Sequence, residues 1–428
     1  MTSTILPVSP HQLRLVARPG RKNGDPFTVV FHWRGRGEID PEQIKTAVHR
    51  LIERHGALRT TFGTTPTGEF MQVIAASPRD EQFVWIEADD NREVADALVA
   101  KMADKCFPLA DGPLFEFSLI TGPADEFDIV LAVDHVVVDE GSSKVLRRDF
   151  LTLMTDSDQL SKPAPLNMQG CAAEDPADVE FWRTQLDRLP PRVFADRHDR
   201  SLVGGPHIVS SADLTAEEAS LVRRNAREAR VSLASYFLSA TVLGVRAMSG
   251  AEDLAISMPA DTRDSEDELE TVGYYQNLIP TVVRTEATDS VHEVRVAASA
   301  ALMEALEHRR LPLWRLMQMF DPSGREGVDP LLEILFSYHL PGCDIWEIPG
   351  AELHPVVEDG PTQIVEMNVS VDWRDDGRCN MGVTVDPSLA SPEKLASALQ
   401  AMRASLLMQR PEAEATQARD FLQHPAGA

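Results

Sequence analysis

The segment Asp134-His135-Val136-Val137-Val138-Asp139 combines a histidine with two carboxylates. It follows an apolar run that is typical of a β-strand, and Gly141 comes soon after it. A histidine at the end of a strand projects from a fixed backbone. An ordinary histidine has a pKa of roughly 6.5, so its neutral imidazole can accept a proton at pH 7. General-base help of this kind is worth about 10²- to 10⁴-fold in rate. His135 is therefore the leading catalytic candidate.

Spacing alone does not make His135 catalytic. The chain has 12 histidines and 67 acidic residues, so an HxxxD match arises readily by chance. On this basis a structural histidine is the better interpretation. The partner of Asp139 is also open, because an aspartate so close in sequence need not touch the imidazole. It can instead bind a distant arginine and lock the turn.

Strands and helices that alternate along the chain would have to position this segment. In the first half, apolar and β-branched runs predict strands at 27–33, 115–120 and 128–133. A helix is predicted over 40–56, where apolar residues recur on one face between a capping aspartate and a terminal glycine. Further amphipathic helices are predicted at 92–105 and directly after Gly141.

The second half repeats this alternation. Helices are predicted at 179–189, after the capping box of Thr215 and Glu218, at 233–248 and at 392–408. The helix at 233–248 is apolar nearly all round and should be buried. Strands are predicted at 253–258, 278–283, 331–338 and 365–373. Residues 155–176, rich in Asp, Ser, Pro and Gly, are typical of a linker. We therefore predict an α/β or α+β fold with two lobes, residues 1–175 and 176–428.

Composition excludes several classes of protein. No run of about 18 apolar residues is present, and residues 1–12 do not resemble a secretory signal, so we expect a cytoplasmic protein without membrane contact. The four cysteines form no CxxC pair, which favours reduced thiols. The formal net charge of −26 argues against nucleic-acid binding. An acidic carrier protein would need a local basic patch for docking, and 147–148 or 308–310 are candidates, although solvated helix charges are the simpler interpretation.

A series of short motifs lies in a defined order along nearly the whole chain. The motifs are Pro7-Val8-Ser9-Pro10-His11-Gln12, residues 54–62 (RHGALRTTF), 107–114, 134–141, 181–190, 249–253, 258–263 (MPADTR), 273–280 (GYYQNLIP) and 330–338. Together they resemble the condensation-domain superfamily, which comprises peptide-synthetase condensation domains and related polyketide-associated and chloramphenicol-type acyltransferases. Each motif is moderately specific, whereas their joint order is highly specific.

The resemblance implies a fold and a reaction. The fold would be two chloramphenicol-acetyltransferase-like lobes in a V-shaped pseudodimer, with an active-site tunnel between them. The reaction would be attack of an amine or hydroxyl on a thioester. His135 matches the catalytic histidine, which takes the proton of the nucleophile or orients it. Asp139 matches the structural aspartate, and we expect it to pair with Arg59 or Arg263. Asn277 is expected to hydrogen-bond the backbone and support the site.

The chain departs from the family pattern on both sides of His135. Asp134 replaces a histidine that is usually structural, and its carboxylate would act on the imidazole only if both side chains pointed the same way, which alternation along a strand disfavours. Glu140 replaces the glycine of the motif, and Gly141 follows one position late. Glu140 could narrow the donor route, remodel the turn or contact a polar substrate, or its side chain could simply turn to solvent.

Four further residues are candidates for contact with the tunnel or the substrate: Gly141, Ser142, Ser337 and His339. Ser142 also completes the pattern DxxxxDxxS with Asp134 and Asp139, which resembles heterocyclisation domains that close a thiazoline or oxazoline ring. Those relatives normally lack the catalytic histidine. We therefore interpret the chain as a condensation type and keep cyclisation as an alternative.

The resulting prediction is a free-standing acyltransferase that forms an amide or ester from a thioester donor in secondary metabolism. We expect no metal and no cofactor of its own, only the phosphopantetheine of a carrier protein or of CoA. No carrier-like segment fits within 428 residues, so the donor is expected in trans. A second hypothesis is a non-catalytic module that binds a carrier protein; His135 and Asp139 favour the enzyme, and Glu140 favours the module. The acyl group, the acceptor and the oligomeric state remain open.

Overall fold

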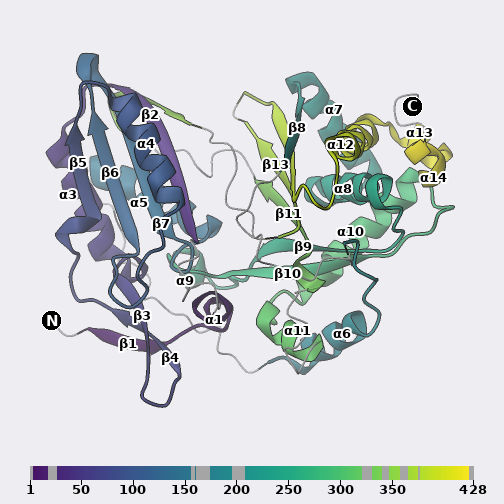
Figure 1. The fold of residues 1–428 in the computed structure, drawn as a ribbon, viewed down its shortest axis with the longest axis horizontal. Helices are drawn as coiled ribbons and strands as arrows, with labels where there is room; N and C mark the ends of the chain where they lie inside the picture. The colour runs from purple at the N-terminus through teal and green to yellow at the C-terminus, as the bar shows by residue number, and fades with distance from the viewer. Residues whose placement is uncertain are drawn as a thin grey trace. The chain divides into compact units, whose positions relative to one another are not determined.

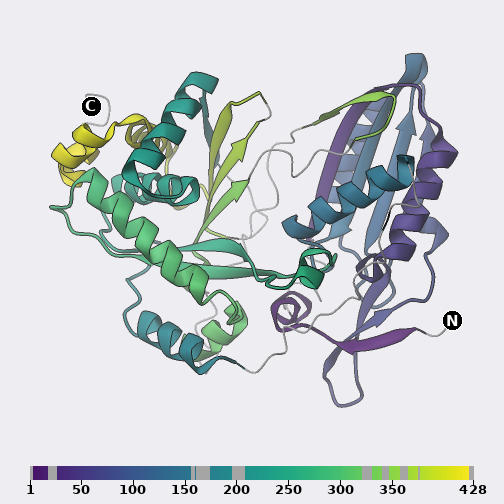
Figure 2. The ribbon, with the colours of Figure 1, turned by 180° about the vertical axis from the view of Figure 1, so that it is seen from behind.

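The computed structural model describes residues 3–17, 27–155, 160, 174–194, 208–320, 330–339, 347–356, 365–374 and 376–423. The chain forms two compact units (Figures 1 and 2). The first unit comprises Met1–Ala173, Asp261–Gln276 and Cys343–Thr362, and the second comprises Glu174–Ala260, Asn277–Gly342 and Gln363–Ala428. The predicted division after residue 175 assigned two of these segments to the second lobe, whereas their contacts group both with the first unit.

The first unit is built on a five-stranded sheet in the order β12-β2-β7-β6-β5. Its strands are β2 (Thr28–Gly37), β5 (Phe83–Glu87), β6 (Phe115–Thr121), β7 (Glu126–Asp134) and β12 (Ala351–Pro355). Neighbouring strands run antiparallel except β5, which pairs with β6 in parallel. The register places Thr28 opposite Asp134. The start of β2 therefore lies beside the end of β7, where His135 follows.

Helices pack on both faces of this sheet (Figure 1). On one face, α4 (Asn91–Ala103) packs through Ala95 and Val99 against Ile120 and Val130. On the other face, α3 (Pro41–Arg54) and α5 (Glu140–Thr155) share a core with alternate residues of β7 such as Leu131. A strand that is buried on both faces reads as a continuous apolar run, which is why β7 was predictable from the sequence.

The first unit also contains a three-stranded sheet, β1-β4-β3, and several short elements. These are β1 (Thr4–Pro7), α1 (Pro10–Val16), η1 (Gly56–Arg59), β3 (Thr60–Thr64), β4 (Phe70–Ile74), η2 (Asp80–Gln82), η3 (Pro123–Asp125) and α9 (Glu266–Leu269).

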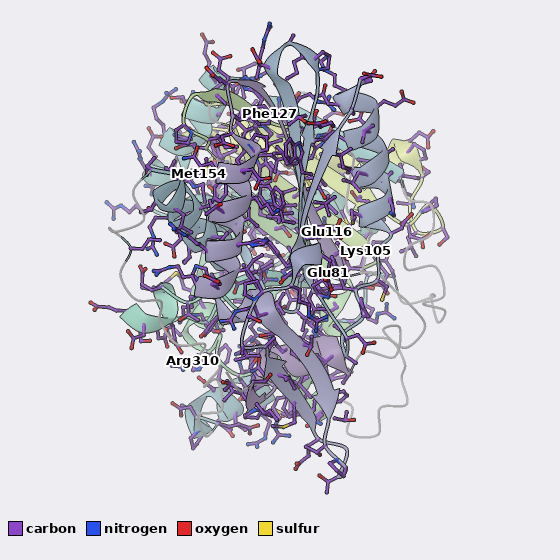
Figure 3. All side chains as sticks on the ribbon, turned by 90° about the vertical axis from the view of Figure 1, so that its left-hand side faces the viewer. Glu81, Lys105, Glu116, Phe127, Met154 and Arg310 are labelled. Atoms are coloured by element: carbon purple, nitrogen blue, oxygen red, sulfur yellow. The ribbon has the colours of Figure 1, made fainter. Side chains whose placement is uncertain are left out.

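Two side chains labelled in Figure 3, Lys105 and Glu116, form an ion pair of 2.7 Å that ties the segment after α4 to β6. Phe127, also labelled there, packs so closely on Gly35 that a side chain at Gly35 would collide with its ring.

The second unit is built on a six-stranded sheet in the order β10-β9-β11-β13-β14-β8. Its strands are β8 (Ile208–Leu214), β9 (Leu254–Asp261), β10 (Gln276–Val283), β11 (Ile334–His339), β13 (Met367–Trp373) and β14 (Cys379–Val385). β11 runs parallel to β9 and to β13, and β14 pairs antiparallel with β13 and β8. The sheet is therefore mixed.

Helices α7, α10, α12 and α14 of the second unit pack against α8 (Leu233–Ser249), which was predicted to be buried because it is apolar nearly all round. This prediction is confirmed: α8 contributes to the core of the unit along its length and packs against α10 and α12. The other elements are α6 (Pro176–Leu186), α7 (Ala216–Ala229), α10 (Val291–Glu307), α11 (Leu313–Phe320), η5 (Pro330–Leu332), α12 (Pro392–Leu407), α13 (Arg410–Ala415) and α14 (Ala418–Gln423).

Among the described helices, none is by itself long and apolar enough to cross a membrane. Only α7 and α8 taken together are long and apolar enough, and the pair is bent by 98°.

The predicted fold class is confirmed as mixed α/β. The strands of strong apolar character were predicted, whereas β1, β3, β4, β5, β8, β12 and β14 were not. The missed strands have four to seven residues, and along none of them is every residue buried. Most of the predicted linker at 155–176, together with Cys171 and Cys343, lies outside the described residues. The V-shaped arrangement and the tunnel remain predictions.

Candidate active site

A tight turn follows β7 and carries the candidate base. The Asp134 N–H donates to the Leu114 carbonyl at 2.9 Å, and the Val137 N–H donates back to the Asp134 carbonyl at 3.1 Å. The buried Asp134 carboxylate accepts the Val136 N–H through Oδ1 at 3.0 Å. Asp134 therefore caps the turn through its side chain. This contact accounts for an aspartate at a position that the family resemblance treats as structural.

The His135 imidazole is held by its own turn. Its Nδ1 lies 2.8 Å from the Val138 carbonyl oxygen. A carbonyl can only accept a hydrogen bond, so Nδ1 carries the proton and the neutral ring keeps its lone pair on Nε2. Nε2 of a half-buried ring is the atom that can accept a proton from a nucleophile.

Two aromatic residues contact the same imidazole, and neither was singled out from the sequence. Phe27 stacks on it, with ring centroids 5.3 Å apart and planes 21° apart. Tyr274 meets it edge-on at 5.5 Å and 78°. The His135 N–H also donates to the Phe27 carbonyl at 2.9 Å. Only the strand register brings Phe27 to His135, so no local pattern could have identified it.

Asp139 forms a buried ion pair with Arg263. Nη1 of Arg263 lies 2.9 Å from Oδ2, and Nη2 lies 2.9 Å from Oδ1. The Tyr275 N–H donates to Oδ2 at 2.8 Å and the Ser142 N–H to Oδ1 at 2.8 Å. Burial alone would raise the pKa of Asp139, but the charge and hydrogen bonds of Arg263 and the bonds from Ser142 hold that pKa below its ordinary value. Of the two predicted cations, Arg263 makes the pair.

Arg59 has a different role from the predicted one. Its Nε donates to the Ile52 carbonyl at 2.9 Å, Nη2 donates to the Glu53 carbonyl at 3.1 Å, and Nη1 bonds the Ala75 carbonyl. These bonds join the end of α3 to the segment after β4. The prediction that Arg59 is a partner for Asp139 is wrong, because the guanidinium is used on backbone carbonyls near its own turn.

Gly141 permits the close approach of Arg263. A Cβ atom at Gly141 would lie 2.5 Å from Nη1 of Arg263 and 3.0 Å from Oδ2 of Asp261. The same guanidinium donates to Asp261 Oδ1 at 3.1 Å and to the Glu268 carbonyl at 3.0 Å. The glycine that follows the motif one position late therefore stands where the ion pair leaves no room for a side chain.

Ser142 was predicted to face the tunnel or substrate, and the structure corrects this. Its side chain is fully buried, with Oγ 2.7 Å from Asp139 Oδ1, 2.7 Å from the Gly273 carbonyl and 3.1 Å from Arg263 Nη2. The hydroxyl is thus part of the ion-pair network.

Glu140 is half-buried and starts α5, where the positive end of the helix dipole favours a carboxylate. Whether it limits the donor route remains a prediction.

The motif at 54–62 supports the site by fixing α5 against α3. Arg54 Nε and His55 Nε2 lie 2.6 Å and 3.0 Å from Oδ2 of Asp149, and Arg148 Nη2 lies 2.8 Å from Oδ1. Burial alone would raise the pKa of Asp149, but the hydrogen bonds from His55, Arg54 and Arg148 hold it well below its usual range. Because Arg148 also pairs with Glu270 at 2.6 Å, the charge of Arg148 in the proposed basic patch at 147–148 is neutralised by carboxylates.

The remaining candidates belong to the second unit. Asn277 donates through Nδ2 to the Arg309 and Leu311 carbonyls, both at 2.8 Å, and accepts the Leu313 N–H at 3.0 Å, which confirms the expected backbone role. Ser337 is nearly buried in β11. At the end of the same strand, His339 Nδ1 lies 2.7 Å from Asp372 Oδ1 on β13.

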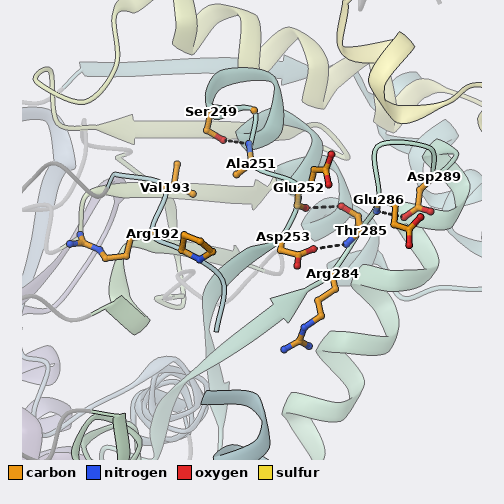
Figure 4. A pocket seen from close by; sticks show the side chains of 12 residues that line it. Arg192, Val193, Ser249, Ala251, Glu252, Asp253, Arg284, Thr285, Glu286 and Asp289 are labelled. Atoms are coloured by element: carbon orange, nitrogen blue, oxygen red, sulfur yellow. Dashed lines mark hydrogen bonds between the residues drawn. The ribbon is translucent and has the colours of Figure 1, made fainter. Parts of the chain in front are cut away.

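A pocket of about 870 Å³ lies in the second unit and is separate from the His135 turn (Figure 4). Arg192 and Arg284 line it together with Glu252, Glu286 and Asp289. Figure 4 shows Asp253 accepting the Thr285 N–H, a contact of 3.0 Å. In the described part of the chain, no group of three or more His, Cys, Asp or Glu side chains is placed to hold a metal ion.

Comparisons with known proteins agree with the observed fold. The family model described as Condensation domain matches residues 2–347. The hybrid PKS-NRPS synthetase lepA of Aspergillus flavus is 24% identical over 391 residues, which cover 87% of this chain and 10% of the synthetase. The malpinin synthetase of Mortierella alpina is 23% identical over 393 residues, covering 87% of this chain and 5% of that protein. The chain thus spans a tenth or less of the length of these multidomain relatives.

Three solved structures share the fold at low identity. The condensation domain of the monacolin K polyketide synthase MokA has a TM-score of 0.80 at 18% identity, covering 100% of this chain and 99% of that one. A starter condensation domain of rhizomide synthetase RzmA in complex with C8-CoA has a TM-score of 0.76 at 17% identity, covering 97% of each chain. The X-domain in complex with OxyB from teicoplanin biosynthesis has a TM-score of 0.75 at 18% identity, covering 94% of this chain and 92% of that one.

The likeness to solved structures places the chain in the class of proteins with the chloramphenicol-acetyltransferase-like fold. Within that class, the chain belongs to the condensation-domain family, because the family model matches most of its length. Condensation domains form amide or ester bonds and work with carrier proteins or acyl-CoA-type substrates.

Proposed function

We propose that this chain is a free-standing, cytoplasmic condensation enzyme of secondary metabolism. It transfers an acyl group from a thioester donor, carried by a carrier protein in trans or by CoA, to an amine or hydroxyl acceptor. The product is an amide or an ester. The observation that carries this proposal is the contact between Nδ1 of His135 and the Val138 carbonyl, because it leaves Nε2 as the proton acceptor.

The proposed reaction uses one base for two proton transfers. The nucleophile attacks the thioester carbonyl carbon while Nε2 of His135 takes its proton. The tetrahedral intermediate then collapses, the carbon–sulfur bond breaks, and the thiolate leaves with the proton from the imidazolium. Phe27 and Tyr274 hold the ring throughout. Asp139 and Arg263 do not exchange protons; they fix the turn from which the ring projects.

The test offers acyl-CoA and acyl-carrier donors with amine and hydroxyl acceptors to the purified chain. Free thiol is followed with a thiol reagent, and products are identified by mass spectrometry. His135→Ala is expected to lower kcat by roughly 10²- to 10⁴-fold. His354→Ala is the matched control, because it removes an exposed histidine of β12 in the same unit. Unchanged turnover in His135→Ala would refute the base assignment.

Two other outcomes separate the alternatives. If the wild-type chain releases no thiol from any donor yet binds an acylated carrier protein, the non-catalytic module is the better description. The likeness to an X-domain that is solved in complex with OxyB means that the fold alone does not distinguish these functions. A product lighter by one further water would indicate heterocyclisation. Ser142 is buried in the Asp139–Arg263 network, so a structural role explains why a serine stands there. This weakens the cyclisation alternative.

A further inference from the structure

We propose that Gln12 is a positioning residue for His135, an inference that rests on the function proposed above. Gln12 lies on α1, in the motif that opens the chain, and it is buried. Its side-chain Nε2 donates to the Val136 carbonyl at 2.8 Å, across 124 residues of sequence. Val136 is the residue directly after His135, so this bond joins α1 to the catalytic turn.

Both ends of the Gln12 amide are used. Oε1 accepts the Ser9 N–H at 3.2 Å, and the Gln12 N–H donates to Ser9 Oγ at 3.1 Å, which completes a capping box at the start of α1. The bond from the Ser9 backbone N–H to Oε1 fixes the orientation of the amide, so that its NH₂ group points to Val136. A residue that only capped the helix would need the side-chain oxygen Oε1 and not the side-chain nitrogen Nε2.

The bond bears on the chemistry of His135 through the backbone. The Val136 carbonyl belongs to the turn that brings the Val138 carbonyl within 2.8 Å of Nδ1. Fixing the peptide group after Val136 restricts that turn, and the restricted turn keeps the proton on Nδ1 and the lone pair on Nε2. The same helix also carries Arg14, whose positive charge acts on Tyr274, the edge-on neighbour of the imidazole. Helix α1 therefore contacts the turn of the base through Gln12 and influences one of its aromatic neighbours through the charge of Arg14.

Two substitutions separate positioning from helix capping. Gln12→Glu keeps an oxygen for the Ser9 N–H, and glutamate is a standard capping-box residue, so a pure capping role predicts a neutral change. Under the positioning role it is damaging, because a carboxylate would face the Val136 carbonyl without a donor. Ser9→Ala is the converse control, since it removes the Oγ acceptor for the Gln12 N–H and leaves the bond between Gln12 and Val136 available.

The first readout needs no substrate. ¹⁵N chemical shifts of the ring nitrogens, with the His135 signals identified by their loss in His135→Ala, report the tautomer. We expect the Nδ1–H form in the wild type and in Ser9→Ala, and a mixture of tautomers in Gln12→Glu. If Gln12→Glu keeps the wild-type shifts, the inference is wrong. This measurement decides the matter even if no acyl transfer is ever found, so it is independent of the proposed function.

The second readout is turnover. Gln12→Glu is expected to lower kcat on the order of 10- to 100-fold with KM nearly unchanged, because the base is displaced and binding surfaces are not. Ser9→Ala is expected to retain wild-type kcat. If Gln12→Glu unfolds, the uncharged Gln12→Met takes its place. This variant keeps the side-chain length but loses both the donor to Val136 and the acceptor for the Ser9 N–H, so its kcat is compared with that of Ser9→Ala, which perturbs only the cap. Wild-type kcat in a folded Gln12→Met would also overturn the inference.

Discussion

The Asp139 carboxylate and the Arg263 guanidinium meet through two hydrogen bonds of 2.9 Å, although 124 residues separate them in the sequence. Both side chains are nearly inaccessible to water. The pair connects the start of α5 to the segment that follows β9, and Ser142, Tyr275 and Asp261 bind to it. The turn that carries His135 is thus fixed at its far end by a buried, bidentate ion pair.

Removal of this arginine should destabilise the chain severely. Arg263→Met leaves the Asp139 carboxylate buried without its cation, and the expected loss is about 3–5 kcal/mol in the free energy of unfolding. The double variant Asp139→Asn/Arg263→Met should lose less than the sum of the single changes, because no lone charge remains. Urea unfolding measures both. Arg183→Met, which breaks an exposed pair with Glu180, is the control and should change stability by less than about 1 kcal/mol.

A methyl group at Gly141 should act on the same pair by steric pressure. Gly141→Ala places a Cβ atom 2.5 Å from Nη1 of Arg263, so the guanidinium must move. Overpacking of this kind typically costs about 1–3 kcal/mol. Gly63→Ala is the matched control, since nothing lies within 4 Å of a Cβ atom there. Equal thermal unfolding midpoints for the two variants would contradict the close approach.

Acid should weaken the contact between α3 and α5. The pKa of Asp149 is depressed in the folded chain, so its contribution to stability is fully present above the ordinary value of 3.8 and is lost as the pH falls through the folded value. Between neutral pH and pH of about 2, the free energy of unfolding of Asp149→Asn should therefore fall less steeply than that of the wild type. Parallel curves from urea unfolding at several pH values would show that Asp149 is not responsible.

Asn277 should be more important for stability than its size suggests. Its side chain satisfies two carbonyls and one N–H in the segment between α10 and α11. Asn277→Ala leaves these groups without their partner, which should cost about 2–3 kcal/mol. Asn277→Asp should be at least as harmful, because a carboxylate would then face two carbonyl oxygens. Asn380→Ala, at an exposed bond to Asp213, is the control and should be nearly neutral.

The sequence by itself determined the elements with strong local patterns and the choice of His135. β7 and α8 were predictable because burial on all sides produces a continuous apolar run, and α3 was predictable because its apolar residues recur on one face. Short or half-exposed strands such as β12 and β14 carry weaker patterns and were missed. The order of the motifs identified the family, which the match over residues 2–347 confirms.

Only the tertiary structure decided which residues meet. Arg59 and Arg263 were equal candidates for Asp139, and the choice of Arg263 depends on packing between segments far apart in the chain. Ser142 changed from a substrate-facing candidate to a buried member of the ion-pair network, and Phe27 entered the site through the register of β2 with β7. Periodicity and capping are local and can be read along the chain. Long-range hydrogen bonds depend on how the elements pack, and no local pattern records them.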